Sequence, residues 1–329
     1  MRRKLRTGVL LFFTLFFVFS VAIGAGISYY LERDHQAKMK ENEEKNIESL
    51  EEVVPELTER INILVMGVDY LKLGSDEGQR GTRTDTIMLF SYNPKNNKSF
   101  LLSIPRDSRV PIEGYGMDKI NHAHSYGGTD LAIRTISNFL EIPIHHYVKV
   151  DYNAVTELVD AVGGLEIDIP QDMHYAALKI HFTKGLQTLS GEEAVKYLRF
   201  RSGYVIPDIG RIGAQQEFVK LMMEKIVSPS LVVNVPTYID ILSRNVETDM
   251  SKKQMLDLSK SLLLKFDPST IEKAHIPGGG QRIGGVDYWI VDETGKNDLL
   301  IELLSDAVDP PPSATTTGDN VVTENDKKE

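Results

Sequence analysis

The sequence has no cysteine among its 329 residues, and basic side chains are fewer than acidic ones. Without disulfides the folded protein must be stabilised by a buried core, which a chain of this length can form. With 37 basic and 47 acidic residues, the formal net charge is -10. An acidic surface repels the phosphates of DNA and RNA, so the composition argues against nucleic-acid binding.

Charged residues are absent from a stretch of 25 residues near the N-terminus, from residue 7 to residue 31. A helix of this length crosses about 30 Å of hydrocarbon. Four basic residues lie in segment 1–6, which is therefore expected in the cytoplasm, with the rest of the chain outside. A cleaved signal peptide is the alternative, because Ala22-Ile23-Gly24-Ala25 loosely resembles a cleavage site. The apolar stretch exceeds the usual length of about 7–15 residues, so we predict an uncleaved anchor and a single-pass type II cell-membrane protein.

Composition also divides the part of the chain that follows the anchor. Residues 32–59 are rich in Glu and Lys and are predicted to form a charged, partly helical linker. Residues 307–329 contain a run of three prolines followed by polar residues, and are predicted to be a disordered tail. No second linker or repeat lies between them, so residues 60–306 are predicted to form one extracellular domain. Without the four N-terminal basic residues, 33 basic residues remain against 47 acidic ones, a net charge of -14 outside the membrane.

Strand and helix patterns alternate along this domain. Strands are expected at 61–68, 86–92, 99–104, 146–150 and 165–169. Helices are expected at 130–140, 152–161, after Ser190, at 210–227, after Ser251 and at 297–307. Ser190-Gly191-Glu192-Glu193 has the pattern of a capping box, which opens a helix. The alternation predicts an α/β domain with a central mixed β-sheet flanked by helices.

Arginine and aspartate cluster in four places, at 83–85, 104–107, 199–201 and 208–211. Arginines that converge in an acidic protein are expected to serve one anionic ligand. In a hairpin centred near residues 95–96, position 85 lies opposite position 106. The geometry therefore predicts Arg83 and Asp85 at the same sheet edge as Arg106 and Asp107.

Asp69 follows the first strand, and it joins this group if that strand runs parallel to 99–104. Carboxylates from Asp69 and Asp85 suit Mg²⁺, a hard cation held by a few oxygens together with phosphate. Arginine suits the phosphate itself, through bidentate contacts and neutralisation of charge. The sequence therefore favours a phosphate and magnesium site at this edge.

Two further pairs of residues could complete such a site. Arg199 and Arg201 share a face only on an extended segment, so a phosphate-binding role predicts that the preceding helix ends near Leu198. Arg211 and Gln215 are four residues apart near the start of the 210–227 helix, where the helix dipole favours an anion.

Each cluster alone has a structural alternative. Arg83-Thr84-Asp85 could be a surface salt bridge or a turn, and Pro105-Arg106-Asp107 could be a corner after a strand. Arg199 and Arg201 could lie on a solvated helix face, and Asp208 is explained as the N-cap of the next helix. Four histidines lack the spacing of a zinc site, namely His122, His124, His145 and His146. Only the combination of clusters indicates a functional site.

Taken together, the motifs resemble the LytR-CpsA-Psr family of wall-glycopolymer ligases in Gram-positive bacteria. The resemblance covers residues 60–227 in order. The matching segments are Leu64-Val65-Met66-Gly67-Val68-Asp69, Arg83-Thr84-Asp85-Thr86-Ile87-Met88-Leu89, Leu102-Ser103-Ile104-Pro105-Arg106-Asp107, Lys119-Ile120-Asn121-His122-Ala123-His124-Ser125-Tyr126-Gly127-Gly128, Leu158-Val159-Asp160-Ala161-Val162-Gly163-Gly164, Tyr197-Leu198-Arg199-Phe200-Arg201 and 208–216.

This resemblance implies transfer of an undecaprenyl-pyrophosphate-linked glycopolymer, with one phosphate, onto a peptidoglycan hydroxyl, typically the 6-OH of N-acetylmuramic acid. Wall teichoic acid is the first expectation for the polymer, then capsular polysaccharide or teichuronic acid. The implied partners are the lipid-linked polymer, peptidoglycan and the lipid bilayer, and the implied cofactor is Mg²⁺, with Mn²⁺ as a substitute. The implied metal ligands are Asp69 and Asp85, and either carboxylate could accept the proton of the incoming hydroxyl.

The family comparison also implies the residues that hold pyrophosphate: Arg83, Arg106, Arg199, Arg201, Arg211 and Gln215. One departure is Ala214, where the family often has arginine before the glutamine pair. A lipid-pyrophosphate phosphatase and a non-catalytic membrane-anchored binding or regulatory module are the alternative functions.

Overall fold

The computed structural model describes residues 59–68, 83–201, 207–226 and 246–305, together with residues 240 and 244. The predicted anchor, most of the linker, Asp69 and the tail from residue 307 therefore lie outside the described residues. Among the residues described, no helix is both long and apolar enough to cross a membrane.

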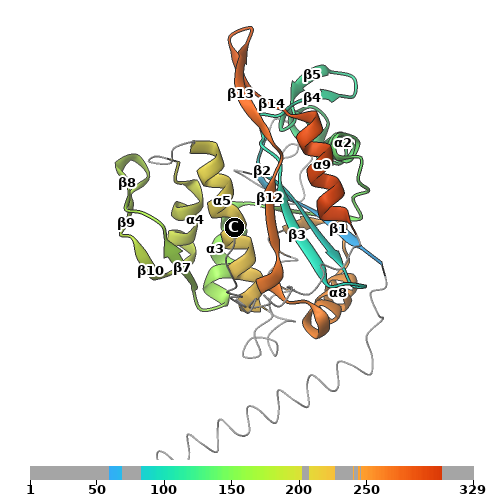
Figure 1. The fold of residues 1–329 in the computed structure, drawn as a ribbon. Helices are drawn as coiled ribbons and strands as arrows, with labels where there is room; N and C mark the ends of the chain where they lie inside the picture. The colour runs from blue at the N-terminus through green and yellow to red at the C-terminus, as the bar shows by residue number, and fades with distance from the viewer. Residues whose placement is uncertain are drawn as a thin grey trace, which may run out of the picture.

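A six-stranded mixed sheet organises the described residues (Figure 1). Its strand order is β11-β6-β1-β2-β3-β12. The strands are β1 Ile61–Val68, β2 Thr84–Asn93, β3 Lys98–Ser103, β6 His146–Val150, β11 Val246–Thr248 and β12 Glu272–His275. β1 pairs antiparallel with β2 and parallel with β6, and β3 pairs antiparallel with β2 and parallel with β12. The predicted α/β class with a mixed sheet is confirmed.

Helices cover both faces of this sheet. Leu64 and Met66 of β1 pack on one face with helices α2 (His122–Leu140) and α9 (Glu293–Leu304). Ile61 and Ile63 point to the other face, where the core includes residues of α5 (Pro207–Ile226) and α8 (Lys252–Lys265). This alternation follows from the two-residue period of a strand. Burial on both faces explains why β1 and β2 read as continuous apolar runs.

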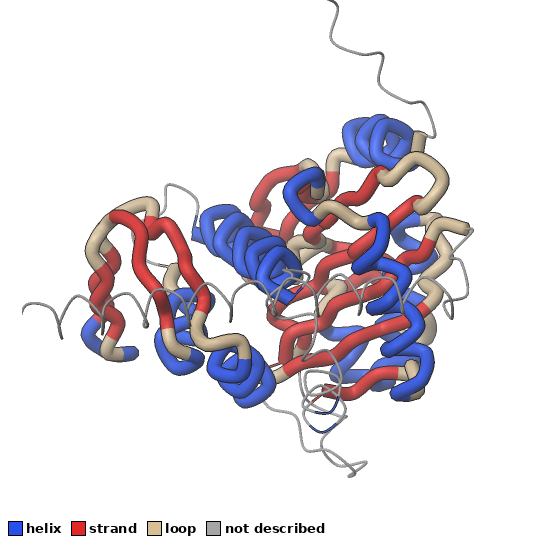
Figure 2. The backbone as a smooth tube through the Cα atoms, turned by 90° about the horizontal axis from the view of Figure 1, so that it is seen from below, coloured by secondary structure: helices blue, strands red, loops and turns tan. Residues whose placement is uncertain are grey.

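A smaller lobe packs beside the sheet and has its own apolar core (Figures 1 and 2). It contains α3 (Tyr152–Ala161), α4 (Gly191–Arg199) and two hairpins. The hairpin strands are β7 Leu165–Ile169 with β10 Gly185–Leu189, and β8 Met173–Tyr175 with β9 Ile180–Phe182; the 3₁₀ turn Ala176–Leu178 joins the latter pair. Helix α5 lies between this lobe and the sheet, because Phe218 packs in the lobe core and Met223 against the sheet core.

Two more hairpins project from one end of the sheet (Figure 1). They are β4 Arg109–Ile112 with β5 Gly116–Lys119, and β13 Gly278–Ile283 with β14 Val286–Val291. A second 3₁₀ turn, Pro268–Thr270, precedes β12. The backbone N–H of Trp289 donates to the Asp107 carbonyl at 2.9 Å, which fixes β14 beside the segment that follows β3.

Helix starts follow their capping residues. Ser190 and Ser251 both form the complete capping box, so both predicted starts are confirmed. The predicted 297–307 helix begins earlier, because Asp292 caps it by accepting a hydrogen bond from the Gly295 N–H at 3.1 Å. Asp208 was expected as an N-cap, but it lies inside the first turn of α5, which begins at Pro207. Proline fits that position because a first-turn N–H has no intrahelical partner.

The predicted 130–140 helix is the second part of α2. Gly127 and Gly128 interrupt α2 with non-helical backbone angles, and Gly128 has φ 67° and ψ -160°. This region of backbone space is open almost only to glycine. The Gly-Gly pair therefore bends α2 between His122–Tyr126, beside the projecting hairpins, and the segment that packs on the sheet.

Candidate functional site

The β2–β3 hairpin brings Asp85 and Arg106 together. Met88 pairs with Ser103, and continuing that register places residue 85 opposite residue 106. The Arg106 guanidinium forms an ion pair with the Asp85 carboxylate, so the geometric prediction is confirmed. Arg106 Nε also lies 3.7 Å from Asp107 Oδ2, and Asp107 Oδ1 lies 2.8 Å from Lys119 Nζ. A chain of alternating charges thus lines the end of the sheet.

The end of β1 reaches the same place. β1 and β3 both run antiparallel to β2, so they run in the same direction, as the prediction for Asp69 required. The last described pair is Val68 with Thr84, directly before Asp85. Gly67 permits this approach, because a Cβ there would lie 2.9 Å from Thr86 Cβ. The position of Asp69 itself remains a prediction.

Helix α5 supplies two adjacent glutamines with different surroundings. Gln215 is half-buried and lines the space next to Asp85. Gln216 is buried, and its amide nitrogen donates to Ser103 Oγ at 2.9 Å and to the Ala274 carbonyl at 2.6 Å. Gln216 therefore fastens α5 to the sheet, while Gln215 stays available to a ligand.

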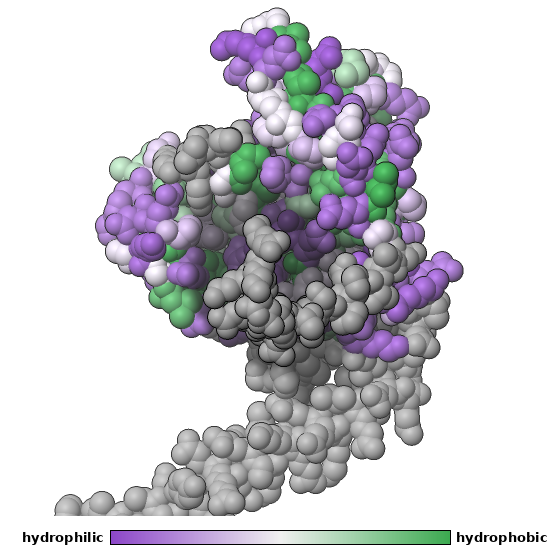
Figure 3. Space-filling view, viewed as in Figure 1, coloured by the Kyte–Doolittle hydropathy of each residue, from purple (hydrophilic) through white to green (hydrophobic). Residues whose placement is uncertain are grey.

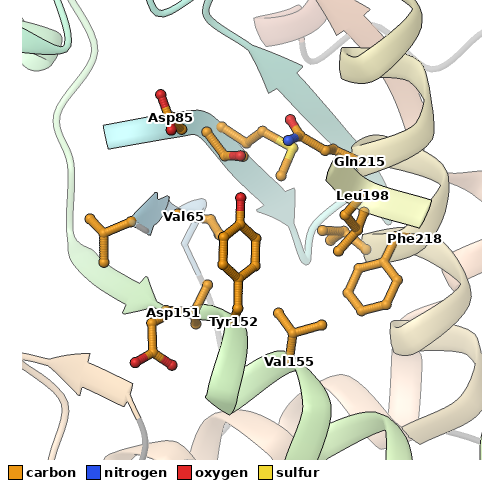
Figure 4. Close-up of a pocket in the computed structure, with 14 residues that line it drawn as sticks. Val65, Asp85, Asp151, Tyr152, Val155, Leu198, Gln215 and Phe218 are labelled. Carbon is orange, nitrogen blue, oxygen red and sulfur yellow. The ribbon is translucent and has the colours of Figure 1, made fainter. Parts of the chain in front are cut away.

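Two pockets meet at these residues. The first, about 550 Å³ including its open mouth, is mainly apolar and lies between the sheet and helices α3, α4 and α5 (Figure 4). Val155, Leu198 and Phe218 form its apolar side, whereas the Tyr152 hydroxyl points towards the side of Asp85 and Gln215.

The second pocket, about 820 Å³, is lined by charged and aromatic residues, among them Arg106, Arg211, Tyr288 and Trp289. Asp85, Thr86 and Gln215 line both pockets. Inside the hollow between the lobe and the sheet, hydrophilic surface is visible (Figure 3). An apolar chamber thus opens directly beside one that is lined by charged groups of both signs.

The remaining predicted arginines differ in their relation to these pockets. Arg211 is 5% exposed and lines the charged pocket. Arg83 is exposed and directly precedes β2, and the positive charge of Arg83 acts on the Tyr126 hydroxyl. As the described residues form them, neither pocket has Arg83, Arg199 or Arg201 in its lining.

Helix α4 ends at Arg199, one residue later than predicted, and Phe200 is extended with φ -68° and ψ 130°. Both Arg199 and Arg201 are exposed. The Arg199 guanidinium carbon lies 5.2 Å from the centre of the Tyr152 ring, which lines the apolar pocket. Arg199 therefore stands at the border of that pocket, held by a cation–π contact.

Ala214 occupies an apolar position in the structure. It is 6% exposed and belongs to the core of the lobe, together with Leu198 and Phe218. A charged guanidinium would not be satisfied among these side chains without a rearrangement. The departure from arginine at this position is thus matched by the packing around it.

The aromatic residues beside the charged pocket carried no sequence signal. The centre of the Tyr288 ring lies 5.7 Å from Lys119 Nζ, yet Tyr288 and Trp289 come from a hairpin about 170 residues further along the chain. Aromatic residues in a late strand have no motif that ties them to an early arginine. No strand of this hairpin is predicted from the sequence; its first strand is the glycine-rich Gly278–Ile283.

A hydrogen-bonded cluster lies next to these residues. Asp118 Oδ2 accepts from the Tyr126 hydroxyl at 2.5 Å and lies 2.9 Å from His122 Nδ1. Burial opposes ionisation of Asp118, but the bonds from Tyr126, His122 and the Lys119 N–H outweigh it and hold its pKa below the ordinary value. The same bond to Asp118, with burial second, raises the pKa of Tyr126.

Carboxylates at the junction of the pockets are the candidate ligands for Mg²⁺. Within the described residues, no three His, Cys, Asp or Glu side chains are grouped as a metal site. Mg²⁺ needs only one or two carboxylates when phosphates supply further oxygens. The Asp85 carboxylate, 18% exposed where both pockets meet, fits that requirement.

The histidines have other contacts. His122 lies by Asp118, His146 Nδ1 is 2.9 Å from Asp249, and His145 Nδ1 accepts from the Asn62 N–H at 2.9 Å. His124 Nε2 lies 3.3 Å from Lys149 Nζ. These four side chains point to separate partners.

Comparison with known proteins gives relatives along most of the chain. A transferase from Bacillus cereus named polyisoprenyl-teichoic acid–peptidoglycan teichoic acid transferase TagU is 33% identical over 287 residues, which are 87% of this chain and 90% of that protein. The crystal structure of Bacillus subtilis TagV is 31% identical with a TM-score of 0.66, and the match covers 75% of this chain and 96% of that one. A structure of TagT bound to LIIa-WTA is 27% identical with a TM-score of 0.63, and covers 74% and 89%. The model of the LytR_cpsA_psr family matches residues 26–303. The chain therefore belongs to the LytR_cpsA_psr family, which its sequence motifs resemble.

Proposed function

We propose that this protein transfers an anionic glycopolymer, wall teichoic acid in the first place, from undecaprenyl pyrophosphate to a peptidoglycan hydroxyl. The observation that carries the proposal is the junction of two pockets at Asp85, Thr86 and Gln215. A donor with an apolar tail and a pyrophosphate needs an apolar chamber that opens beside cationic groups. The relatives named as teichoic acid transferases support the same activity.

In this proposal the isoprenoid enters the apolar pocket, between Val155, Leu198 and Phe218. Burial of apolar surface favours this placement by roughly 25 cal/mol per Å². The pyrophosphate then lies at the junction, where Arg106, Arg211 and Gln215 line the adjoining space. Arg83, Arg199 and Arg201 approach it from the surrounding surface.

The chemistry is an exchange at the phosphorus that carries the polymer. The acceptor oxygen forms a new bond to this phosphorus, and the bond from it to the bridging oxygen breaks. Undecaprenyl phosphate leaves with the bonding electron pair, and the proton of the hydroxyl passes to a carboxylate, Asp85 or Asp69. The protein's main task is to position the groups and neutralise the charge that develops.

Asp69 and Asp85 are the residues that would hold Mg²⁺, or Mn²⁺ in its place. When bound, the cation would supply neutralisation of phosphate charge. The arginines bind and orient the donor, and the apolar chamber excludes water from the prenyl side of the reacting bond.

The arrangement of the chain belongs to the same proposal. An anchor at 7–31 and a linker at 32–59 would hold domain 60–306 outside the membrane, at the surface where a polyprenyl donor is embedded. Residues 307–329 would form a disordered tail.

The decisive experiment supplies the full-length protein with a lipid-linked teichoic acid donor and nascent peptidoglycan. We expect polymer joined covalently to peptidoglycan, together with released undecaprenyl phosphate. A phosphatase would release free polymer and leave the peptidoglycan unmodified. If Arg83→Ala and Asp85→Ala proteins of normal abundance restored polymer attachment fully in cells, both a ligase site at these residues and this proposal would be wrong.

A further inference from the structure

The charged pocket has an aromatic wall that the proposed chemistry leaves without a role. Residues Asp287, Tyr288 and Trp289 of β14 form this wall and line the same pocket as Asp85 and Arg106. The hairpin that carries them projects beyond the sheet (Figure 1), and its tip exposes the apolar residues Ile283 and Val286 among hydrophilic neighbours (Figure 3).

Backbone pairing and cation–π contacts fix the position of this aromatic wall. Trp289 forms a bridge with Ser108, and its N–H donates to the Asp107 carbonyl. The Tyr288 ring lies over two cations from the neighbouring hairpin, with Arg109 Cζ at 5.8 Å and Lys119 Nζ at 5.7 Å from the ring centre. Both cation–π contacts fix the orientation of the ring.

The direction of the reaction assigns a use to each pocket. In phosphoryl transfer the attacking and leaving oxygens lie roughly in line through the phosphorus. If the leaving undecaprenyl phosphate is drawn towards the apolar pocket, the acceptor hydroxyl must arrive from the opposite side of the junction. That side is the charged pocket, whose lining includes Tyr288 and Trp289.

We propose that Tyr288 is the platform on which a sugar ring of the acceptor glycan strand stacks, with Trp289 and Asp287 beside it. This inference rests on the proposed function and adds the acceptor subsite to it. A pyranose has an apolar C–H face that packs on an aromatic ring, and hydroxyl groups at its edge that bind carboxylates. The exposed carboxylate of Asp287 supplies such an acceptor.

Two carboxylates that line the pocket with Tyr288 have cationic partners. Lys119 pairs with Asp107 at 2.8 Å, and Asp287 Oδ1 lies 3.9 Å from Arg282 Nε with the Asp287 side chain 79% exposed. The exposed Asp287 carboxylate therefore remains accessible to sugar hydroxyls that donate hydrogen bonds.

Trp289 gives a direct measurement of this binding, because it is the only tryptophan of the chain. Full-length protein in detergent would be titrated with a peptide-free tetrasaccharide of alternating N-acetylglucosamine and N-acetylmuramic acid, and Trp289 fluorescence recorded. We expect saturable binding, a Kd about tenfold higher in Tyr288→Ala, and near-normal binding in Tyr288→Phe, which keeps the ring. Tyr175→Ala, at an exposed tyrosine of the other lobe, is the matched control and should bind normally.

Kinetics separate the acceptor from the donor. Tyr288→Ala should raise the KM for the glycan acceptor about tenfold, while the KM for the lipid-linked donor and its slow hydrolysis by water stay unchanged. An equal loss in donor hydrolysis would place the ring on the donor and overturn the proposal, as would unchanged glycan binding in Tyr288→Ala. Glycan binding without any transfer by the parent protein would instead refute the proposed function and leave the glycan subsite standing.

Discussion

The Arg106 guanidinium and the Asp85 carboxylate form an ion pair across the β2–β3 hairpin, at the point where the two pockets meet. Both side chains remain about one-fifth exposed, at 22% and 18%. The pair therefore faces the space of the two pockets, and it holds the arginine in place where the proposed pyrophosphate would bind. Such preorganised charge is worth more to a transition state than a charge that must be repositioned.

Replacing Arg106 by Ala should lower kcat by about 10²–10³, because one preorganised charge donor is lost. Arg106→Lys should recover only part of this, since lysine keeps the charge but not the planar, bidentate geometry. The measurement is polymer transfer at saturating donor, together with a melting curve that verifies the fold. Arg244→Ala is the control, because Arg244 pairs with Asp240 at an exposed site. Equal transfer by Arg106→Ala and the parent protein would contradict the role given to this pair.

Substitution of the two adjacent glutamines of α5 should have different effects, one on the stability of the fold and the other on donor binding. Gln216→Ala should destabilise the protein by about 1–3 kcal/mol, because the Ser103 hydroxyl and the Ala274 carbonyl lose a buried donor. Gln215→Ala should leave the free energy of unfolding nearly unchanged and raise the KM for the donor. Urea unfolding and transfer kinetics on both variants test this. The opposite assignment, with Gln215→Ala the unstable variant, would show that the roles are reversed.

A buried lysine of strand β6 gives a stability prediction that is independent of activity. Lys149 is 1% exposed, and its Nζ lies 2.8 Å from Glu247 and 3.0 Å from Thr129 Oγ1. Glu247→Gln should cost about 3–5 kcal/mol, because it leaves a buried ammonium without its counter-charge. The same change in the surface pair of Lys273, Glu217→Gln, should cost about 1 kcal/mol or less. Similar losses for the two variants in urea unfolding would rule out this difference.

The pKa of Asp118 predicts a pH dependence of stability. Its folded-state pKa is lowered, so the ionised carboxylate stabilises the fold above the ordinary aspartate pKa of about 4, and this contribution is lost as the pH falls through the folded value. Asp118→Asn should therefore reduce the free energy of unfolding more at pH 7 than at pH 3. Tyr126→Phe, which removes one hydrogen bond to the carboxylate, should show a smaller effect of the same sign.

Urea unfolding at both pH values gives the comparison for Asp118. Asp298→Asn, at an exposed carboxylate of α9, is the control and should lower stability little at either pH. A loss in Asp118→Asn that is the same at pH 7 and pH 3 would mean that ionisation of this group does not stabilise the fold.

Local chemistry in the sequence was sufficient for a large part of the site. A short turn fixes hairpin register, so residues 85 and 106 could be paired by counting from residues 95–96. The i, i+2 spacing of Arg199 and Arg201 correctly required a helix end, because α4 stops at Arg199 and Phe200 is extended. Hydrogen bonds between residues close in sequence determine both the register of the β2–β3 hairpin and the end of helix α4.

Counting residues from a turn cannot predict contacts between segments that are far apart in the sequence. Nothing in the order of residues shows that β14 lies beside the end of β3, or that Tyr288 covers Lys119. The different surroundings of Gln215 and Gln216 cannot be predicted from the sequence either. The two residues are of the same type and differ only in the face of α5 that they occupy. These relationships arise when helices and hairpins pack on a completed sheet.

By itself the sequence determined the class of fold, the hairpin that joins Asp85 to Arg106, and the anionic character of the expected ligand. Periodicity, capping and turn chemistry act over a few residues, so they can be read directly from the chain. The tertiary structure alone decided that an apolar pocket adjoins the charged one, and that aromatic residues of a distant hairpin line the charged pocket. Pockets are made by side chains far apart in sequence, whose proximity follows from burial of the common core rather than from any local pattern.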